Sequence, residues 1–171
     1  MIKVIGAKGK IKDIDNFLEK INIFAKKNNF IIQTFDADFV FGKNHIISAV
    51  EHAVRAISRK TNTTNSLEKE ILLYASGERQ LKLAIPKIGV KKKDIANIAV
   101  VLIEKTKKTI SNNIVDDLLK SLCLTRDDKV LEGDKNTLTR FGIKENEIET
   151  VMKNKYEDLI LEKVAMVDII K

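Results

Sequence analysis

The sequence predicts an α/β fold of the α+β kind, in which several helices cover a small mixed, partly antiparallel β-sheet. Short segments rich in β-branched or alternating apolar residues recur between longer segments whose apolar residues repeat every three or four positions. This is the pattern of strands that alternate with amphipathic helices. One Pro and seven Gly among 171 residues leave no flexible linker, so residues 1–171 are expected to form a single domain.

The N-terminal segment predicts the order strand, helix, strand. Residues 2–9 (IKVIGAKG) begin with alternating apolar and polar side chains, as a short strand does. Residues 14–25 place six apolar side chains on one helical face, and Asp13 is positioned to cap that helix. Residues 30–41 (FIIQTFDADFVF) are rich in β-branched and aromatic residues, which predicts a strand with a break near Asp36.

Three helices are expected to follow. Asn44 is expected to cap a strongly amphipathic helix that extends to about Lys60, and Asn65 or Ser66 is expected to cap the next one. That second helix is expected to end at Gly77, because a helix C-terminus favours a glycine in the left-handed conformation. The third helix has its apolar repeat at Leu81, Ile85 and Ile88.

The second half of the chain predicts two strands and further helices. Residues 97–104 (NIAVVLIE) form a continuous apolar run of strand length, which is typical of a central strand. Residues 111–122 repeat apolar side chains with the period of a helix. Residues 128–133 (DKVLEG) predict a short strand, and the remainder of the chain is expected to be helical.

Composition leaves two interpretations of the charge open. The formal net charge of +7 suits an anionic partner such as RNA or DNA. However, 31 basic residues offset by 24 acidic ones also describe the solvated surface of a protein from an AT-rich genome. Cys123 is the single cysteine, which excludes a disulfide framework and a cysteine-based zinc site. With no apolar run long enough for a signal peptide or a bilayer span, a cytoplasmic location is predicted.

Most catalytic templates are absent from the sequence. It contains no P-loop, no GxGxxG motif and no HExxH motif. His45 and His52 share one predicted helix but lie about 10 Å apart along its axis, which is too far for one metal ion. We expect both histidines to face solvent on the polar stripe of that helix. No catalytic residue, metal or cofactor is therefore predicted.

Two basic segments are candidates for phosphate contacts. Arg55 and Arg59 lie on the polar face of the helix before the TNTTNS loop, and Lys60 and Lys69 flank that loop. Hydroxyl groups and the helix N-terminus that follows would add neutral donors to such a track. The alternative is an ordinary solvated face. For residues 89–94 (GVKKKD) a solvated loop is the favoured interpretation.

The C-terminal segment predicts a helix over residues 155–170 that has two apolar faces. The broader, core-facing stripe is Tyr156, Leu159, Ile160, Val164, Met166 and Val167. Leu161, Ala165 and Ile169 form a second stripe at four-residue spacing, and acidic residues separate the two. A helix of this kind is expected to pack on the core with one face and to bind a partner with the other. In the alternative, residues 166–171 (MVDIIK) leave the helix as an edge strand.

The middle of the sequence resembles a known family. Residues 35–91 contain a helix of the form HIISAVEHA, a polar loop that ends in Asn65 and Ser66, the segment EILLYASGERQ and a short AIPKIG helix. Together with the C-terminal LILEKVAMVDI, these features resemble the small kinase-binding subunit of the KEOPS complex, the CGI/PRPK-binding protein family, in its archaeal form. Outside residues 35–91 and the C-terminal helix, the resemblance extends only to the order of the elements.

The resemblance implies a non-enzymatic subunit of the complex that installs threonylcarbamoyl on the adenosine next to the tRNA anticodon. In that complex a transferase subunit carries the chemistry, and a Bud-type kinase with ATPase activity binds the transferase. The small subunit docks on the N-lobe of the kinase and captures the unpaired CCA end of tRNA. The stripe of Leu161, Ala165 and Ile169 then becomes the expected kinase contact.

The resemblance also directs attention to Arg79 and Gln80, which capping rules do not require. They follow Gly77, where the lack of a side chain would let an incoming strand approach the backbone closely. The residues expected to bind RNA are Arg55, Arg59, Lys60, Asn65, Ser66, Lys69, Gly77, Arg79 and Gln80. Two other functions remain open, namely a module that regulates a kinase without binding RNA and a small enzyme with an unrecognised site.

Overall fold

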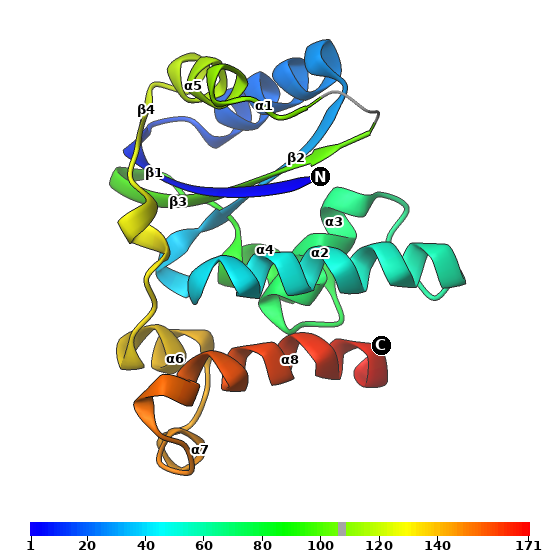
Figure 1. The fold of residues 1–171 in the computed structure, drawn as a ribbon, viewed down its shortest axis with the longest axis vertical. Coiled ribbons are helices and arrows are strands. Elements are labelled where there is room, and N and C mark those ends of the chain that lie inside the picture. The colour runs from blue at the N-terminus through cyan, green and yellow to red at the C-terminus, as the bar shows by residue number, and fades with distance from the viewer. Residues whose placement is uncertain (106–108) are drawn as a thin grey trace.

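In the computed structural model, which describes residues 1–105 and 109–171, helices cover both faces of a four-stranded β-sheet (Figure 1). The strands are β1 (Ile2–Ile11), β2 (Phe30–Asp36), β3 (Lys93–Glu104) and β4 (Leu124–Arg126). The α-helices are α1 (Ile14–Asn28), α2 (Gly42–Arg59), α3 (Leu67–Ser76), α4 (Leu81–Ile88), α5 (Asn112–Ser121), α6 (Lys135–Phe141), α7 (Glu145–Ile148) and α8 (Tyr156–Ile170). Short 3-10 helices occupy Ala37–Phe39, Asp128–Leu131 and Lys153–Lys155.

The helices form two layers on one side of the sheet and one layer on the other. α1 and α5 cover the upper face in Figure 1, and α2, α3 and α4 cover the lower face. α8 packs against α2 and α3 from below, with α6 and α7 near its N-terminal end. Because α3 has neighbours on all sides, every residue from Glu70 to Ser76 is buried.

β3 is the central strand of the sheet. It lies between β2 and β1, and β4 pairs with the other edge of β1. The pairings that join the described strands are all antiparallel, so the sheet is not mixed. β1 and β2 run parallel to each other, as two strands joined by one crossover helix do, but β3 is inserted between them and pairs with both. The α+β class is confirmed, and so is the central strand predicted at residues 97–104.

Local capping signals located several helix ends correctly. The Asp13 side chain caps α1 by accepting a backbone hydrogen bond from its first turn. Ser66, rather than Asn65, caps α3 through the backbone N–H of Lys69. Gly77 ends α3 in the left-handed conformation, with φ at 69°, so the prediction of a glycine C-cap is confirmed.

The strand predicted at residues 128–133 is wrong. The Asp128 carboxylate accepts a hydrogen bond of 2.8 Å from the Gly6 N–H, and the Asp127 side chain accepts one from the Lys129 N–H. These bonds turn the chain into a 3-10 helix at the edge of β1. The short strand β4 forms just before it instead.

His45 is fully buried, contrary to the prediction that it faces solvent. Its Nε2 donates to the Ala75 carbonyl at 2.8 Å, and its Nδ1 accepts from the Phe41 N–H at 3.1 Å. The second bond satisfies the Phe41 N–H, just before the first residue of α2. The helix therefore begins at Gly42 and needs no cap from Asn44. Burial lowers the pKa of His45 to about 4, so the imidazole is neutral in the folded protein.

The protein should lose stability in mild acid because of His45. An unfolded histidine binds a proton below about pH 6.5, whereas folded His45 resists protonation until about pH 4. The contribution of His45 to the free energy of unfolding should therefore fall by about 3 kcal/mol between these limits and then level off. Denaturant titrations across this pH range measure the loss. A His45→Gln variant should not show this loss. If its free energy of unfolding fell equally steeply over the same pH range, the assignment to His45 would be contradicted.

Candidate nucleic-acid and protein interfaces

α8 presents one buried and one exposed apolar face. Its buried side chains are Leu159, Ile160, Val164 and Val167. On the exposed face Ile169 is 75% exposed, Ala165 is also exposed and Leu161 is half-buried. Met166 was expected in the core stripe but is 40% exposed, because it lies at the border of that stripe. Residues 166–170 continue the helix, so the alternative edge strand is not formed.

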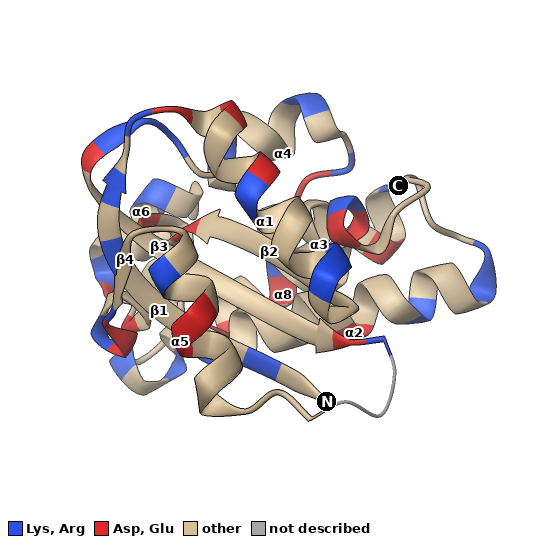
Figure 2. Ribbon diagram, turned by 90° about the horizontal axis from the view of Figure 1, so that it is seen from above, with Lys and Arg blue, Asp and Glu red and all other residues tan. Residues whose placement is uncertain are grey.

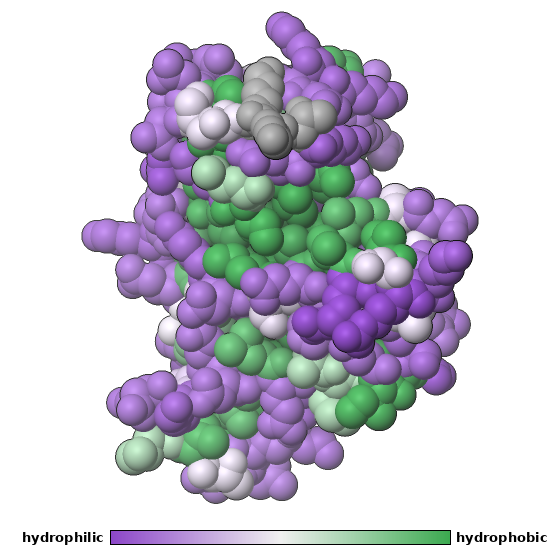
Figure 3. All heavy atoms as spheres, turned by 45° about the vertical axis from the view of Figure 1, so that its right-hand side comes forward, coloured by the Kyte–Doolittle hydropathy of each residue, from purple (hydrophilic) through white to green (hydrophobic). Residues whose placement is uncertain are grey.

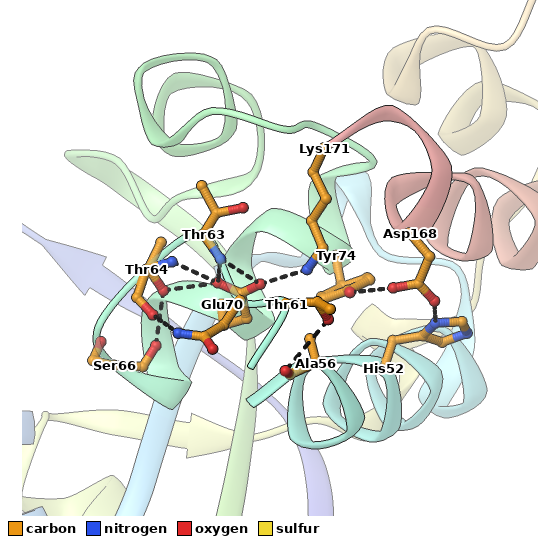
Figure 4. Close-up of polar contacts among 11 residues, drawn as sticks. His52, Ala56, Thr61, Thr63, Thr64, Ser66, Glu70, Tyr74, Asp168 and Lys171 are labelled. Carbon is orange, nitrogen blue, oxygen red and sulfur yellow. Dashed lines mark hydrogen bonds and ion pairs between the residues drawn. The ribbon is translucent and has the colours of Figure 1, made fainter. Parts of the chain in front are cut away.

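Hydrogen bonds tie the C-terminal end of α8 to α2 and α3 (Figure 4). The Tyr74 hydroxyl donates to one carboxylate oxygen of Asp168, and His52 Nδ1 lies 2.7 Å from the other. Burial alone would raise the pKa of Asp168, but the bonds from Tyr74 and His52 outweigh burial and lower it. Burial and the bond to Asp168 together raise the pKa of Tyr74. Asp168 is therefore ionised and Tyr74 protonated at neutral pH.

Glu70 of α3 is fully buried, and its carboxylate holds the loop that precedes the helix (Figure 4). It accepts hydrogen bonds from the backbone N–H groups of Thr63 and Thr64, at 3.1 and 2.9 Å, and from the Thr64 hydroxyl at 2.9 Å. Lys171 Nζ donates at 2.7 Å and lies 4.3 Å from the centre of the Tyr74 ring. Burial alone would raise the pKa of Glu70, but these bonds, led by that of Lys171, lower it.

Neither Glu70 nor Lys171 was predicted to be a functional or structurally important residue. The one available signal was that Glu70 directly precedes the apolar segment ILLYA, where a charged side chain has no obvious path to solvent. A carboxylate in such a position requires donors that converge on it. The donors come from a loop and from the far end of the chain, which no local pattern connects.

The structure divides the residues expected to bind RNA into two groups. One group surrounds the loop between α2 and α3, namely Arg55, Arg59, Lys60, Asn65, Ser66 and Lys69. The other follows α3 at its opposite end, namely Gly77, Arg79 and Gln80. The ten-residue helix α3 is about 15 Å long. The nine residues expected to bind RNA therefore lie at two places, one at each end of α3.

The backbone at Gly77 is also covered. A Cβ atom on Gly77 would lie 3.5 Å from Lys163 Cβ and 3.5 Å from the Phe141 ring, so α8 and α6 occupy the space where an incoming strand was expected. Arg79 is exposed beside this joint, and Gln80 begins α4 without a side-chain capping bond.

Ser66 and Lys69 instead line a hollow of about 470 Å³ along the edge strand β2. β2 contributes Gln33 and Thr34 to the hollow. Its apolar walls come from α1, α3 and the end of α4, with Ile14, Leu18, Leu72, Ile85 and Val90. The remaining polar residues of the lining are Asn22, Ser66, Glu68 and Lys69. An apolar hollow with such a margin can hold a flat, partly polar group such as a nucleobase.

Exposed apolar surface also gathers on the side of the molecule seen in Figure 3. Two hydrophobic areas lie above and below a strongly hydrophilic band in that view. Among the exposed large apolar side chains of the protein are Val54 (46%) and Ile57 (38%) of α2 and Ile169 (75%) and Ile170 (41%) of α8. Exposed apolar surface of this kind is typical of protein interfaces.

Two searches for other classes of site give no candidate within residues 1–105 and 109–171. No group of three His, Cys, Asp or Glu side chains there is arranged to hold a metal ion. No helix in that part of the chain combines the length and the apolar character that a membrane span requires.

Comparison with known protein families identifies the family of the chain. Residues 10–168 match the family described as kinase binding protein CGI-121. The match covers nearly the whole chain, including α2, α3, the loop between α2 and α3, and α8 as far as Asp168. A search of curated proteins gives no match.

Replacing Lys171 with Met should lower the free energy of unfolding by about 3 kcal/mol, because the Glu70 carboxylate would stay buried without its cation. Hydrogen exchange at the Thr63 amide, which donates to that carboxylate, should become faster. Lys155→Met is the control, since it removes only an exposed ion pair and should cost less than about 1 kcal/mol. Unchanged exchange at Thr63 in the Lys171 variant would show that the loop does not depend on this contact.

Proposed function

Because the chain belongs to the family of kinase-binding proteins described as CGI-121, we propose that it is the non-catalytic small subunit of KEOPS. In this role it docks on the N-lobe of the Bud-type kinase, reaches the transferase subunit through that kinase, and delivers tRNA by its CCA end. The absence of a catalytic template from the sequence supports a non-catalytic role. Modification of tRNA by such a complex would take place in the cytoplasm.

The exposed face of α8 supports the kinase contact. Leu161, Ala165 and Ile169 repeat every four residues on one side of the helix, which gives a continuous apolar strip with charged residues along its borders. Asp168, at the border of the strip, binds His52 of α2 and Tyr74 of α3, and Lys171, just after the helix, binds Glu70 of α3. The strip is therefore held rigid before a partner arrives, which lowers the entropic cost of docking.

An Ile169→Glu substitution should abolish co-purification with the kinase. The side chain is 75% exposed, so the protein should fold normally while a charge is placed at the C-terminal end of the docking strip. Ile23→Glu is the matched control, because Ile23 is 59% exposed on α1, in the layer on the opposite face of the sheet. Quantitative pull-down of the kinase by each variant measures the effect. Normal recovery with Ile169→Glu would reject α8 as the docking helix.

The hollow beside Ser66 and Lys69 is the observation that carries the tRNA proposal. Unpaired nucleotides are recognised by stacking of bases on flat or apolar surfaces and by cations that contact phosphates. The walls of the hollow supply the apolar surface, and Lys69 supplies a cation at its margin. Anchoring the CCA end here would raise the effective concentration of the anticodon loop at a distant active site.

A double variant tests the hollow. Lys69→Glu with Ile85→Asp should weaken binding of intact tRNA by about tenfold and make it insensitive to removal of the CCA end. Both side chains are exposed, so folding should be preserved. Lys82→Glu with Leu83→Asp is the control, since it makes the same changes on exposed positions of α4 that do not line the hollow. Equal discrimination for the CCA end in both double variants would reject this site.

The exposed apolar side chains on α2 and α8 favour a second candidate function, a protein-interaction module that regulates the kinase without binding RNA. The two proposals differ in one measurement. Binding of tRNA by the isolated protein that weakens with added salt supports the RNA role, whereas kinase binding without any affinity for tRNA supports the second candidate.

A further inference from the structure

We propose that the lysine-lined end of the sheet, where β1 ends and β3 begins, binds the phosphate backbone of the double-stranded RNA that adjoins the unpaired tail. This inference rests on the proposed tRNA function and adds a contact that the tail site does not contain. It concerns Lys10, Lys12, Lys20 and Lys92, of which the sequence analysis assigned none to a function.

The backbone pairing of β1 and β3 brings these lysines together. Ile11 lies opposite Lys93 beyond a register shift in the antiparallel pair, so residues 10–12 and 92–94 run side by side. Two hollows, of about 340 and 480 Å³, share the wall formed by residues 10–12. The first extends to Lys20 on α1, and the second is lined by residues 92–94.

Several of these lysines carry charge that no carboxylate in the described chain neutralises. Lys93 is bound by Asp36 and Asp38, at 2.9 and 3.0 Å, and Lys10 pairs with Asp94. In contrast, Lys12, Lys20 and Lys92 are exposed and make no ion pair within residues 1–105 and 109–171. Figure 2 shows Lys and Arg concentrated along the side of the molecule on which β4 and the neighbouring ends of the strands lie.

The lowered pKa of Asp94 is consistent with a positive potential at this end of the sheet. The hydrogen bond and the charge of Lys10 lower the pKa of Asp94, and Lys12 lowers it further. The other acid at the hollows, Asp13, is occupied in capping α1. An incoming anion would therefore meet five lysines and two carboxylates among the residues that line the hollows.

The chemistry of the lining favours phosphate over a base or a protein side chain. The hollows contain no Arg, Tyr or Trp, and the single aromatic residue, Phe17, is buried. Lysine ammonium groups act as point charges without the fork that reads a base edge. Such a surface attracts a nucleic-acid backbone independently of sequence.

The position of the hollows points to duplex RNA next to the tail. The hollow that contains Ser66 and Lys69 is also lined by Ile14 and Val90. These residues are the chain neighbours of Asp13 and Lys91, at the margin of the lysine-lined surface. An unpaired tail that occupied the first hollow would thus bring the adjoining base-paired arm onto the lysines.

The test compares two triple variants of the full chain that lose the same charge. Lys12→Ala/Lys20→Ala/Lys92→Ala removes the unpaired lysines, and Lys26→Ala/Lys27→Ala/Lys120→Ala removes exposed lysines elsewhere on α1 and α5. The probes are tRNA, the same tRNA without its CCA end, and a short single-stranded RNA that ends in CCA. Binding is measured over a range of salt concentrations.

The first triple variant should bind both tRNA forms about tenfold more weakly, with a salt slope lower by about 2 to 3 units, while binding the short RNA as the unchanged protein does. The second triple variant should bind all three probes nearly normally. Equal weakening in both variants, or no weakening in either, would overturn the proposal. Loss of kinase co-purification with tRNA binding intact would also overturn it, because the surface would then contact protein.

The two proposals can fail separately. If the unchanged protein binds tRNA equally well without the CCA end, and the first triple variant abolishes that binding, the tail site is wrong and the lysine contact stands. If the short RNA binds but the first triple variant leaves tRNA affinity and salt slope unchanged, the tail site stands and the lysine contact is wrong. If the unchanged protein binds none of the three probes, both proposals fail.

Discussion

The buried carboxylate of Glu70 is the interaction on which the candidate surfaces depend. It joins the loop before α3 and α3 itself to Lys171, which lies 101 positions away after α8. An ionised group in the interior is tolerated only while its donors stay in place, because each lost donor leaves charge that neither water nor protein compensates. The geometry of the loop and the position of the C-terminal end of α8 are therefore fixed together.

The contacts of Glu70 position both the C-terminal end of α8 and the loop before α3. Lys171 and Asp168 hold the buried face of α8 against α2 and α3, which leaves the opposite strip free for a partner. The same carboxylate positions the loop whose last residue, Ser66, caps α3 and lines the hollow along β2. The proposed kinase contact and the proposed tail site thus depend on one network. The lysine-lined surface depends instead on the pairing of β1 with β3.

Roles that depend on neighbouring residues could be predicted from the sequence, whereas roles that depend on distant segments could not. Asp13, Ser66 and Gly77 act within one or two turns of their own helix, so their roles could be read from neighbouring residues. His45 was misassigned because its burial depends on Ala75, thirty positions away, and on the packing of α3 against α2. The grouping of Arg79 with the loop residues failed for the same reason, since it required the path of α3 in space.

The sequence by itself determined the α+β class, the central strand, most helix ends and the family resemblance, because periodicity, capping and motif spacing are properties of short segments. Only the tertiary structure decided which polar groups are buried, which candidate residues share a surface and where hollows lie. Those features arise where segments distant in the chain meet. The partners of Glu70 could not be inferred from its neighbours, because the donors that stabilise its charge become adjacent only when the chain is folded.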